Sequence, residues 1–168
     1  FENIEVPPTL VSFAVTTEKI PNIISNEFKA AGHKLCLLVP EYDANGLPVT
    51  ESLLANFAAV TEAMRAGKVY AAYTPGVGGI GEAVMKMSFG NAIGAALENI
   101  SVAELFGYHY GSFVLEVAED YEIGKVIGKT VDEAEISLNG ETVCLTALQK
   151  AYEDKLESVY SCNIPDVV

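Results

Sequence analysis

The spacing of apolar residues along the chain predicts short β-strands separated by helices. Runs rich in Val, Ile, Leu and aromatic residues, bounded by Gly, Pro, Asn or Asp, are typical of strands. Such runs predict strands at Thr9–Thr17, Lys34–Tyr42, Val69–Tyr73, Ala92–Leu97, Gly111–Val117 and Lys125–Val131. Further along, Asn139-Gly140 predicts a hairpin with a two-residue type I′ turn.

Apolar residues three to four positions apart predict helices between these strands. The clearest helix is Glu51–Arg65, with Thr50 as a candidate N-cap and Gly67 just beyond its end. Further helical segments are expected at Ile80–Phe89, Ser101–Phe106 and Thr146–Tyr160. Because hairpins alternate with helical crossovers, the pattern predicts an α+β fold, a layered domain in which helices cover a mixed β-sheet.

Length and composition indicate a domain that is neither membrane-bound nor nucleic-acid-binding. Half of the 168 residues are apolar, which is enough for one core. No run reaches the ~20 apolar residues that span a bilayer, and no signal peptide is visible at the N-terminus, so we expect a cytoplasmic location. The formal charge of −13 disfavours nucleic acid, because phosphate backbones require clustered Lys and Arg.

The two ends of the sequence suggest that it is part of a longer protein. It starts at Phe1 instead of Met, and Val6-Pro7-Pro8 comes before the first predicted strand. We expect residues 1–168 to form a single domain of a larger multidomain chain. Residues 1–8 would then be a lead-in segment, and residues 161–168 a tail toward a following domain.

A glycine cluster between the predicted strand at Val69–Tyr73 and the following helix is the main candidate site. Gly76, Gly78, Gly79 and Gly81 allow a ligand to approach the backbone, and the N-terminal N–H groups of a helix attract anions. These four glycines are therefore candidate phosphate- or nucleotide-binding residues. A second interpretation is a turn that only packs a helix closely on the sheet.

The same cluster also satisfies the G-x-G-x-x-G pattern, with Glu98 at about the distance of a ribose-binding acid. This third interpretation, an NAD-binding Rossmann domain, requires a parallel sheet opened by the glycine-bearing strand. It is disfavoured by the two strands predicted before the cluster.

Lys86 and Asn91 are candidate secondary contacts to a ligand. Each also has an ordinary structural interpretation: Lys86 as a solvated helix lysine, and Asn91 as a left-handed residue that caps the helix. The three cysteines follow no metal-binding spacing and are interpreted as reduced core thiols at Cys36, Cys144 and Cys162. No residue is assigned a catalytic or a metal-binding role.

Taken in order, several segments resemble the C-terminal domain of the aminoimidazole ribonucleotide synthetase-like enzymes. The likeness is greatest to the second such domain of the large phosphoribosylformylglycinamidine synthases, and it covers nearly the whole chain. It is carried by Pro8–Ala14, Lys34–Val39, Ser52–Ala66, Gly78-Gly79, Met87–Asn91, Tyr110–Ser112 and Ile127–Thr130.

The resemblance implies a part in an ATP-dependent carbon–nitrogen ligase of purine biosynthesis. In that family ATP and Mg²⁺ activate the amide of formylglycinamide ribonucleotide, and ammonia from a glutaminase domain (a glutamine amidotransferase) converts it to the amidine. The implied partners are the ATP-binding domain, the glutaminase domain and the ribonucleotide, and the fragment alone is expected to be inactive. Family members usually have an acid where this chain has Val77. That difference leaves open a non-catalytic interaction or dimerisation domain with a degenerate glycine turn.

Overall fold

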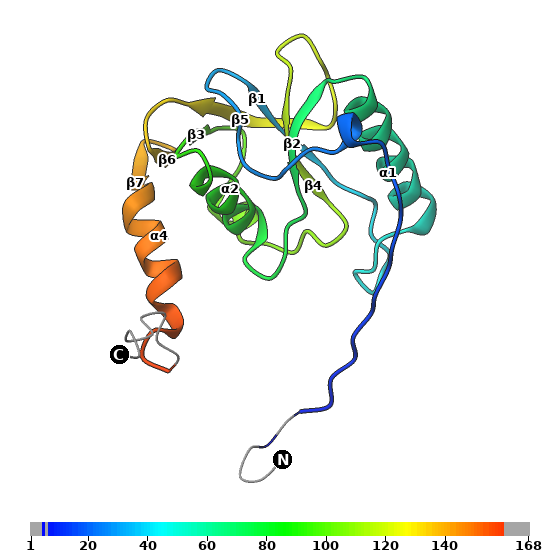
Figure 1. Cartoon of the computed structure of the whole chain (residues 1–168), viewed down its shortest axis with the longest axis horizontal. Helices are drawn as coiled ribbons and strands as arrows, with labels where there is room; N and C mark the ends of the chain where they lie inside the picture. The colour runs from blue at the N-terminus through cyan, green and yellow to red at the C-terminus, as the bar shows by residue number, and fades with distance from the viewer. Residues whose placement is uncertain (1–4, 6, 160–168) are drawn as a thin grey trace, which may run out of the picture.

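The computed structural model describes residue 5 and residues 7–159. Most of the expected lead-in and the whole of the expected tail at 161–168 therefore lie outside the described residues. The described strands form one seven-stranded sheet in the order β2-β4-β1-β5-β3-β6-β7 (Figure 1). The strands are β1 (Lys34–Leu38), β2 (Val69–Tyr73), β3 (Gly94–Leu97), β4 (Phe113–Val117), β5 (Lys125–Val131), β6 (Glu135–Leu138) and β7 (Glu141–Cys144).

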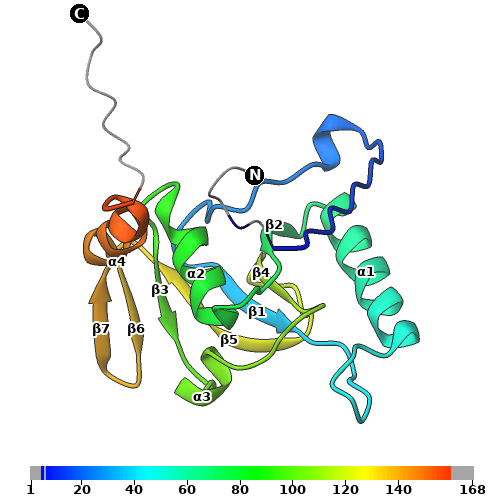
Figure 2. The same ribbon diagram turned by 90° about the horizontal axis from the view of Figure 1, so that it is seen from below.

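The sheet is mixed, because β3 and β6 are parallel while the other neighbouring pairs are antiparallel. The helices are α1 (Thr50–Arg65), α2 (Gly79–Phe89), α3 (Val102–Leu105) and α4 (Leu145–Glu153), with 3-10 turns η1 (Ile20–Asn22) and η2 (Asp154–Leu156). Figure 2 shows the β6–β7 hairpin and α4 at one end of the sheet and α1 at the other. The predicted α+β fold is confirmed.

Side chains alternate between the two faces of each strand, so the sheet carries a separate apolar core on each face. On β1, Leu35 and Leu37 pack in the cluster that contains α2, whereas Cys36 packs in the cluster that contains α1. The α2 face is the larger, with Ile80, Val84 and Met87 of the helix fully buried.

Most predicted elements are confirmed, with shifted ends. The predicted strand at Ala92–Leu97 begins only at Gly94, because Ala92 has a left-handed φ of 54°. The type I′ turn is confirmed, since Asn139 and Gly140 both have positive φ, 53° and 85°. The last predicted helix continues after Glu153 as the 3-10 turn η2, and Tyr160 lies outside the described residues.

Three predictions about the elements and the sheet are wrong. Thr9–Thr17 forms no strand but an exposed, extended segment, because no described strand pairs with it. Thr50 is the first helical residue instead of the cap, which is Val49. The Rossmann interpretation fails because β2, the strand before the glycines, lies at the edge of a mixed sheet and, among the described strands, pairs only with the antiparallel β4.

The cysteines also differ from one another. Cys36 is a buried thiol as predicted, and burial raises its pKa. The prediction of a core thiol is wrong for Cys144, which is exposed because it lies at the end of the edge strand β7, all four residues of which are exposed. Cys162 lies outside the described residues. Within the part that the structure describes, no helix combines the length and the apolar character needed to cross a membrane.

A fully buried carboxylate ties the segment at residues 28–33, here called the strap, to the centre of the sheet. Glu116 of β4 accepts the backbone N–H of Lys29 at 2.9 Å, and Nδ1 of His33 lies 2.6 Å from its other oxygen. Thr130 of β5 donates its hydroxyl to the carbonyl of Ala30 at 2.7 Å. These bonds satisfy the buried charge and fix the strap beside the sheet.

Candidate functional site

The four candidate glycines lie together at the junction where β2 leads into α2. Gly78 is the N-cap of α2, and Gly79 is its first residue. The turn is closed by a hydrogen bond from the N–H of Gly79 to the carbonyl of Gly76 at 3.1 Å. An 11-residue helix that opens on glycine leaves backbone donors in its first turn, which is the geometry expected for anion binding.

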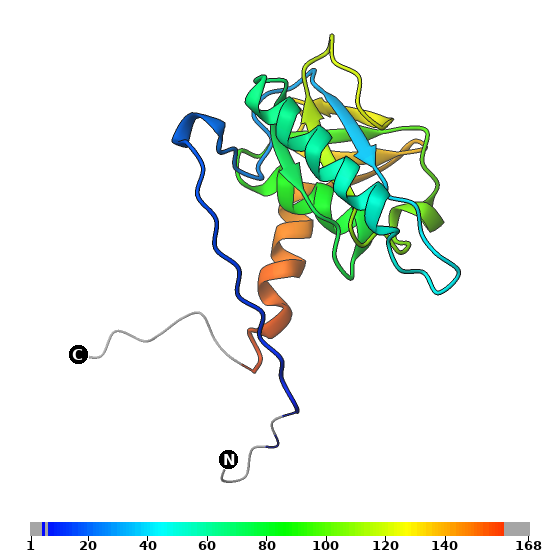
Figure 3. The same cartoon turned by 90° about the vertical axis from the view of Figure 1, so that its right-hand side faces the viewer.

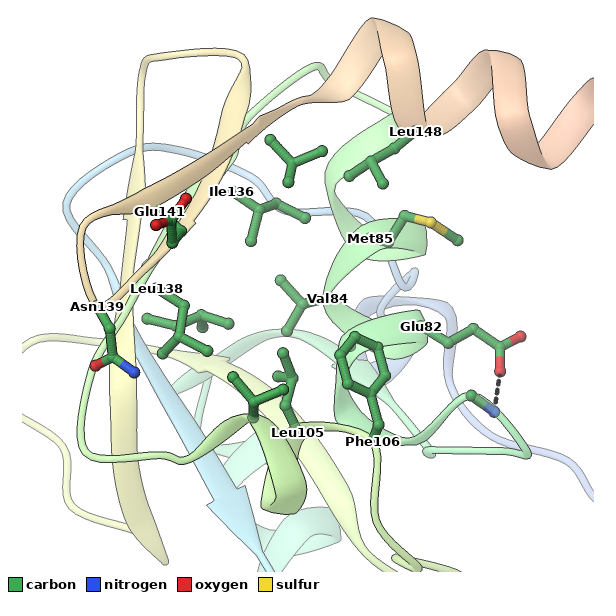
Figure 4. A pocket seen from close by; sticks show the side chains of 15 residues that line it. Glu82, Val84, Met85, Leu105, Phe106, Ile136, Leu138, Asn139, Glu141 and Leu148 are labelled. Atoms are coloured by element: carbon green, nitrogen blue, oxygen red, sulfur yellow. Dashed lines mark hydrogen bonds between the residues drawn. The ribbon is translucent and has the colours of Figure 1, made fainter.

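One of these donors is already engaged by the helix itself. The carboxylate of Glu82 folds back over the turn and accepts the N–H of Gly78 at 2.8 Å (Figure 4, dashed line). Its other oxygen lies 2.5 Å from the ammonium of Lys86, one turn further along the helix. The ion pair with Lys86 and the Gly78 N–H lower the pKa of Glu82, so the carboxylate is charged at neutral pH. It occupies a position that a bound anion would also use.

The glycines have packing reasons of their own. Gly79 has a φ of +65°, and a Cβ there would lie 2.7 Å from the carbonyl oxygen of Leu105. A Cβ on Gly81 would lie 2.7 Å from the ring of Phe106. The turn is therefore pressed against the end of α3 and the loop that follows it, and only glycine permits this approach.

Beside the turn lies an apolar groove of about 490 Å³ between α2, α3, the β6–β7 hairpin and α4. Figure 4 shows Met85, Leu105, Ile136 and Leu148 around it, with Glu82 at one side and Asn139 at the hairpin end. Its lining also includes Gly78, Gly81, Val84, Leu97, Val102, Phe106, Leu138, Glu141 and Val143. Sequence reasoning missed this groove, because six elements spread over residues 78–148 assemble it.

Of the two secondary candidates, Lys86 lies one helical turn beyond Glu82, and Asn91 lies at the other end of α2. Lys86 is held by Glu82 and lies over the ring of Tyr152, 5.3 Å from its centre. Asn91 follows the other end of α2, roughly 16 Å along the helix axis from the turn. Its side-chain amide donates to the carbonyl of Phe28 at 2.7 Å. The left-handed residue after the helix is Ala92, so the prediction of Asn91 as a left-handed cap is wrong.

The residues around the turn do not fit a Mg²⁺ ion. Within residue 5 and residues 7–159, no group of three or more His, Cys, Asp or Glu side chains is placed to hold a metal. Glu82 is the acid at the turn, and both of its oxygens are committed, one to Gly78 and one to Lys86. Val77, where the resembled family usually has an acid, points an apolar side chain into solvent and is 90% exposed.

No protein-family model matches the sequence. Among solved structures, the chain is similar to Thermotoga maritima PurL in complex with AMPPCP, with 15% identity and a TM-score of 0.63 over 76% of this chain and 27% of that chain. The phosphoribosylformylglycinamidine synthase II of T. maritima gives 13% identity and a TM-score of 0.62 over 74% and 27%. PurLQS of T. maritima gives 12% and 0.66 over 78% and 28%.

The chain has the fold of a PurL domain. The resemblance inferred from the sequence is thus confirmed at the level of the fold, which is what identities this low establish. The chain spans only 27 to 28% of the length of these PurL structures.

Proposed function

We propose that this chain is one domain of a phosphoribosylformylglycinamidine synthase, an ATP- and glutamine-dependent ligase of cytoplasmic purine biosynthesis. In this proposal the domain helps to complete a nucleotide or ribonucleotide site and does not catalyse alone. ATP with Mg²⁺, an ATP-binding domain and a glutaminase domain would come from the rest of the enzyme. The domain boundaries, 1–168 with a lead-in at 1–8 and a tail at 161–168, belong to the same proposal.

The observation that supports it is the agreement of the sequence resemblance with an independent structural match. The PurL neighbours include complexes with AMPPCP, ATP, ADP and FGAR, and they match about three quarters of the chain. The match covers less than a third of the length of each PurL structure. The proposed role is therefore that of one domain and not of the whole enzyme.

Within this function, the turn at Gly76, Gly78, Gly79 and Gly81 is the proposed phosphate contact. The position of Glu82 adds a condition to that proposal. A phosphate can use the Gly78 N–H only if the Glu82 carboxylate moves away, since two anions repel at this distance. Lys86 would then lose its partner and become free to approach the phosphate.

Calorimetric titration of the chain with ATP-Mg²⁺ and with ribose 5-phosphate tests the contact. Saturable binding is expected, and it should be about tenfold tighter in Glu82→Gln, because the competing charge is removed. Glu51→Gln, an acid in the first turn of α1, is the matched control and should leave binding unchanged. Absence of saturable binding in both the parent chain and Glu82→Gln would remove the phosphate contact.

A second assay addresses catalysis. The chain alone should form no amidine from formylglycinamide ribonucleotide with ATP, Mg²⁺ and glutamine or ammonia. Turnover by the fragment would contradict the proposal that it depends on other domains.

The competing function is a non-catalytic interaction or dimerisation domain. Three features favour it. Glu82 already binds the Gly78 N–H, and Gly79 and Gly81 are needed for close packing against the end of α3. In addition, Val77 stands where the resembled family usually has an acid. This function predicts no effect of either phosphate ligand on the melting temperature, even at millimolar concentration.

A further inference from the structure

The segment Thr9–Thr17 is the most exposed apolar stretch of the described chain. Leu10, Val11, Phe13 and Val15 are 94%, 80%, 89% and 77% exposed, values close to those of an unfolded peptide. In Figures 1 and 3 the blue ribbon of this segment runs away from the sheet and its helices. Apolar side chains that gather in solvent in this way mark an interaction surface.

Its chemistry is that of a β-strand. Residues 6–17 carry no charged side chain, although the chain has a net charge of −13. Val11, Phe13 and Val15 alternate with Ser12 and Ala14, so an extended backbone places the three large side chains on one face. Among the described residues, no backbone hydrogen bond joins residues 9–17 to another segment. The alternating pattern and the backbone groups without a described partner are both typical of a strand that pairs with the edge of a sheet.

We propose that Thr9–Thr17 is a strand that completes the β-sheet of another domain in the same longer chain. The partner is a sheet with an open edge and one apolar face, which would cover Val11, Phe13 and Val15. The inference rests on the proposed function to the extent that a neighbouring domain of the same protein must exist.

The C-terminal end of the segment is held against α1, and this fixes where a partner sheet could lie. At its C-terminal end, Glu18 pairs with Arg65 in the last turn of α1, and its carboxylate also accepts from the side chain of Asn22. These contacts fix the point at which the strand leaves this domain. The partner sheet would therefore sit beside the C-terminal end of α1, within the roughly 30 Å that nine extended residues span.

The area favours an attached domain over a second copy of the chain. Four side chains of this size bury on the order of 500 Å², whereas an interface between separate proteins buries about 800 Å² on each partner. Within one chain the two surfaces are held at high effective concentration, and a smaller area suffices.

Amide hydrogen exchange on two proteins tests the proposal: the 168-residue chain and the intact protein encoded by its own gene. In the 168-residue chain, residues 10–16 should exchange at the rate of an unstructured peptide. In the intact protein the same amides should exchange at least about 100-fold more slowly. Phe13→Asp should abolish that protection in the intact protein, whereas Leu54→Ser, an exposed apolar residue of α1, should leave it unchanged.

Equal exchange in both proteins overturns the inference. So does protection in the 168-residue chain that rises with its concentration and accompanies a dimer in sedimentation, because the partner is then a second copy. Amidine formation by the same intact protein is assayed in parallel. An active protein with an unprotected segment removes this inference alone, and an inactive protein with a protected segment removes the proposed function alone.

Discussion

The two faces of the sheet are covered to different degrees. Of the 11 residues of α2, six are buried, and four of them pack in a core that reaches from Phe28 to Ile127. Of the 16 residues of α1, only Val60 and Ala63 are buried, and Leu54 remains 59% exposed. The α2 face therefore buries a larger core, whereas the smaller core on the α1 face leaves most residues of α1 at least partly exposed.

Replacing a methionine on each helix compares the two faces directly. Met87→Ala on α2 removes a fully buried side chain and should lower the free energy of unfolding by about 4 kcal/mol. Met64→Ala on α1 removes a partly buried one and should cost about 1 kcal/mol. Urea denaturation of both variants measures the difference. Equal losses would show that the faces contribute alike.

Gly79 tests how tightly the turn is pressed against the end of α3. Gly79→Ala adds a Cβ beside the Leu105 carbonyl and strains a positive φ, so we expect a loss of about 3 kcal/mol. Gly46 also has a positive φ, +78°, but open space around it. Gly46→Ala should therefore show the strain alone, about 1 kcal/mol. A similar loss for both would mean that the close contact contributes nothing.

The buried carboxylate on the α2 side gives the next effect. Glu116→Gln removes the charge that accepts two backbone N–H groups and faces His33, and about 2 kcal/mol should be lost. The exposed Glu98 provides the control, because Glu98→Gln should change stability very little. Faster hydrogen exchange at Lys29 and Ala30 would show that the strap itself has loosened. Unchanged exchange there would contradict its attachment through Glu116.

The smallest change in the free energy of unfolding is expected for the acid in the first turn of α2. Glu82→Gln should cost about 1 kcal/mol at pH 7, because the carboxylate binds the Gly78 N–H and Lys86. Its pKa is below the usual 4.5 in the folded state, so this stabilisation is complete above that pH and is lost as the pH falls through the folded pKa.

The stability gap between the parent chain and Glu82→Gln should therefore close in acid. Glu51→Gln, an acid in the first turn of α1, is the control variant for the same measurement. Thermal melts between pH 3 and pH 7 make the comparison. A constant gap over that range would show that Glu82 is not charged in the way proposed.

The local sequence pattern was enough to predict elements that depend on a few neighbouring residues, such as a tight turn or an amphipathic helix. Asn139-Gly140 encodes its own turn, and the apolar stripe of Glu51–Arg65 fixes a helix. The strand pattern of Thr9–Thr17 was equally clear but does not say which sheet accepts it, so the prediction of a strand within this domain failed. Pairings such as β3 with β6 depend on contacts between distant residues, which no local pattern contains.

The candidate site was predictable only in part. The glycines predicted a tight turn before a helix, but they did not predict that Glu82 folds over that turn. One signal was present: Gly78, Glu82 and Lys86 are spaced four residues apart, and this spacing aligns them along one side of α2. The groove beside the turn had no such signal, since its walls come from α2, α3, α4 and three strands.

The parallel pairing of β3 with β6 has a mechanical consequence. The β6–β7 hairpin joins the rest of the sheet through this one ladder, and α4 follows directly from β7. A pulling force applied at the C-terminal end of α4 would act first on the β6–β7 hairpin. The strands would then detach in order from β7 inward, and β1, β4 and β5 at the centre would bear the force only after the outer strands had separated.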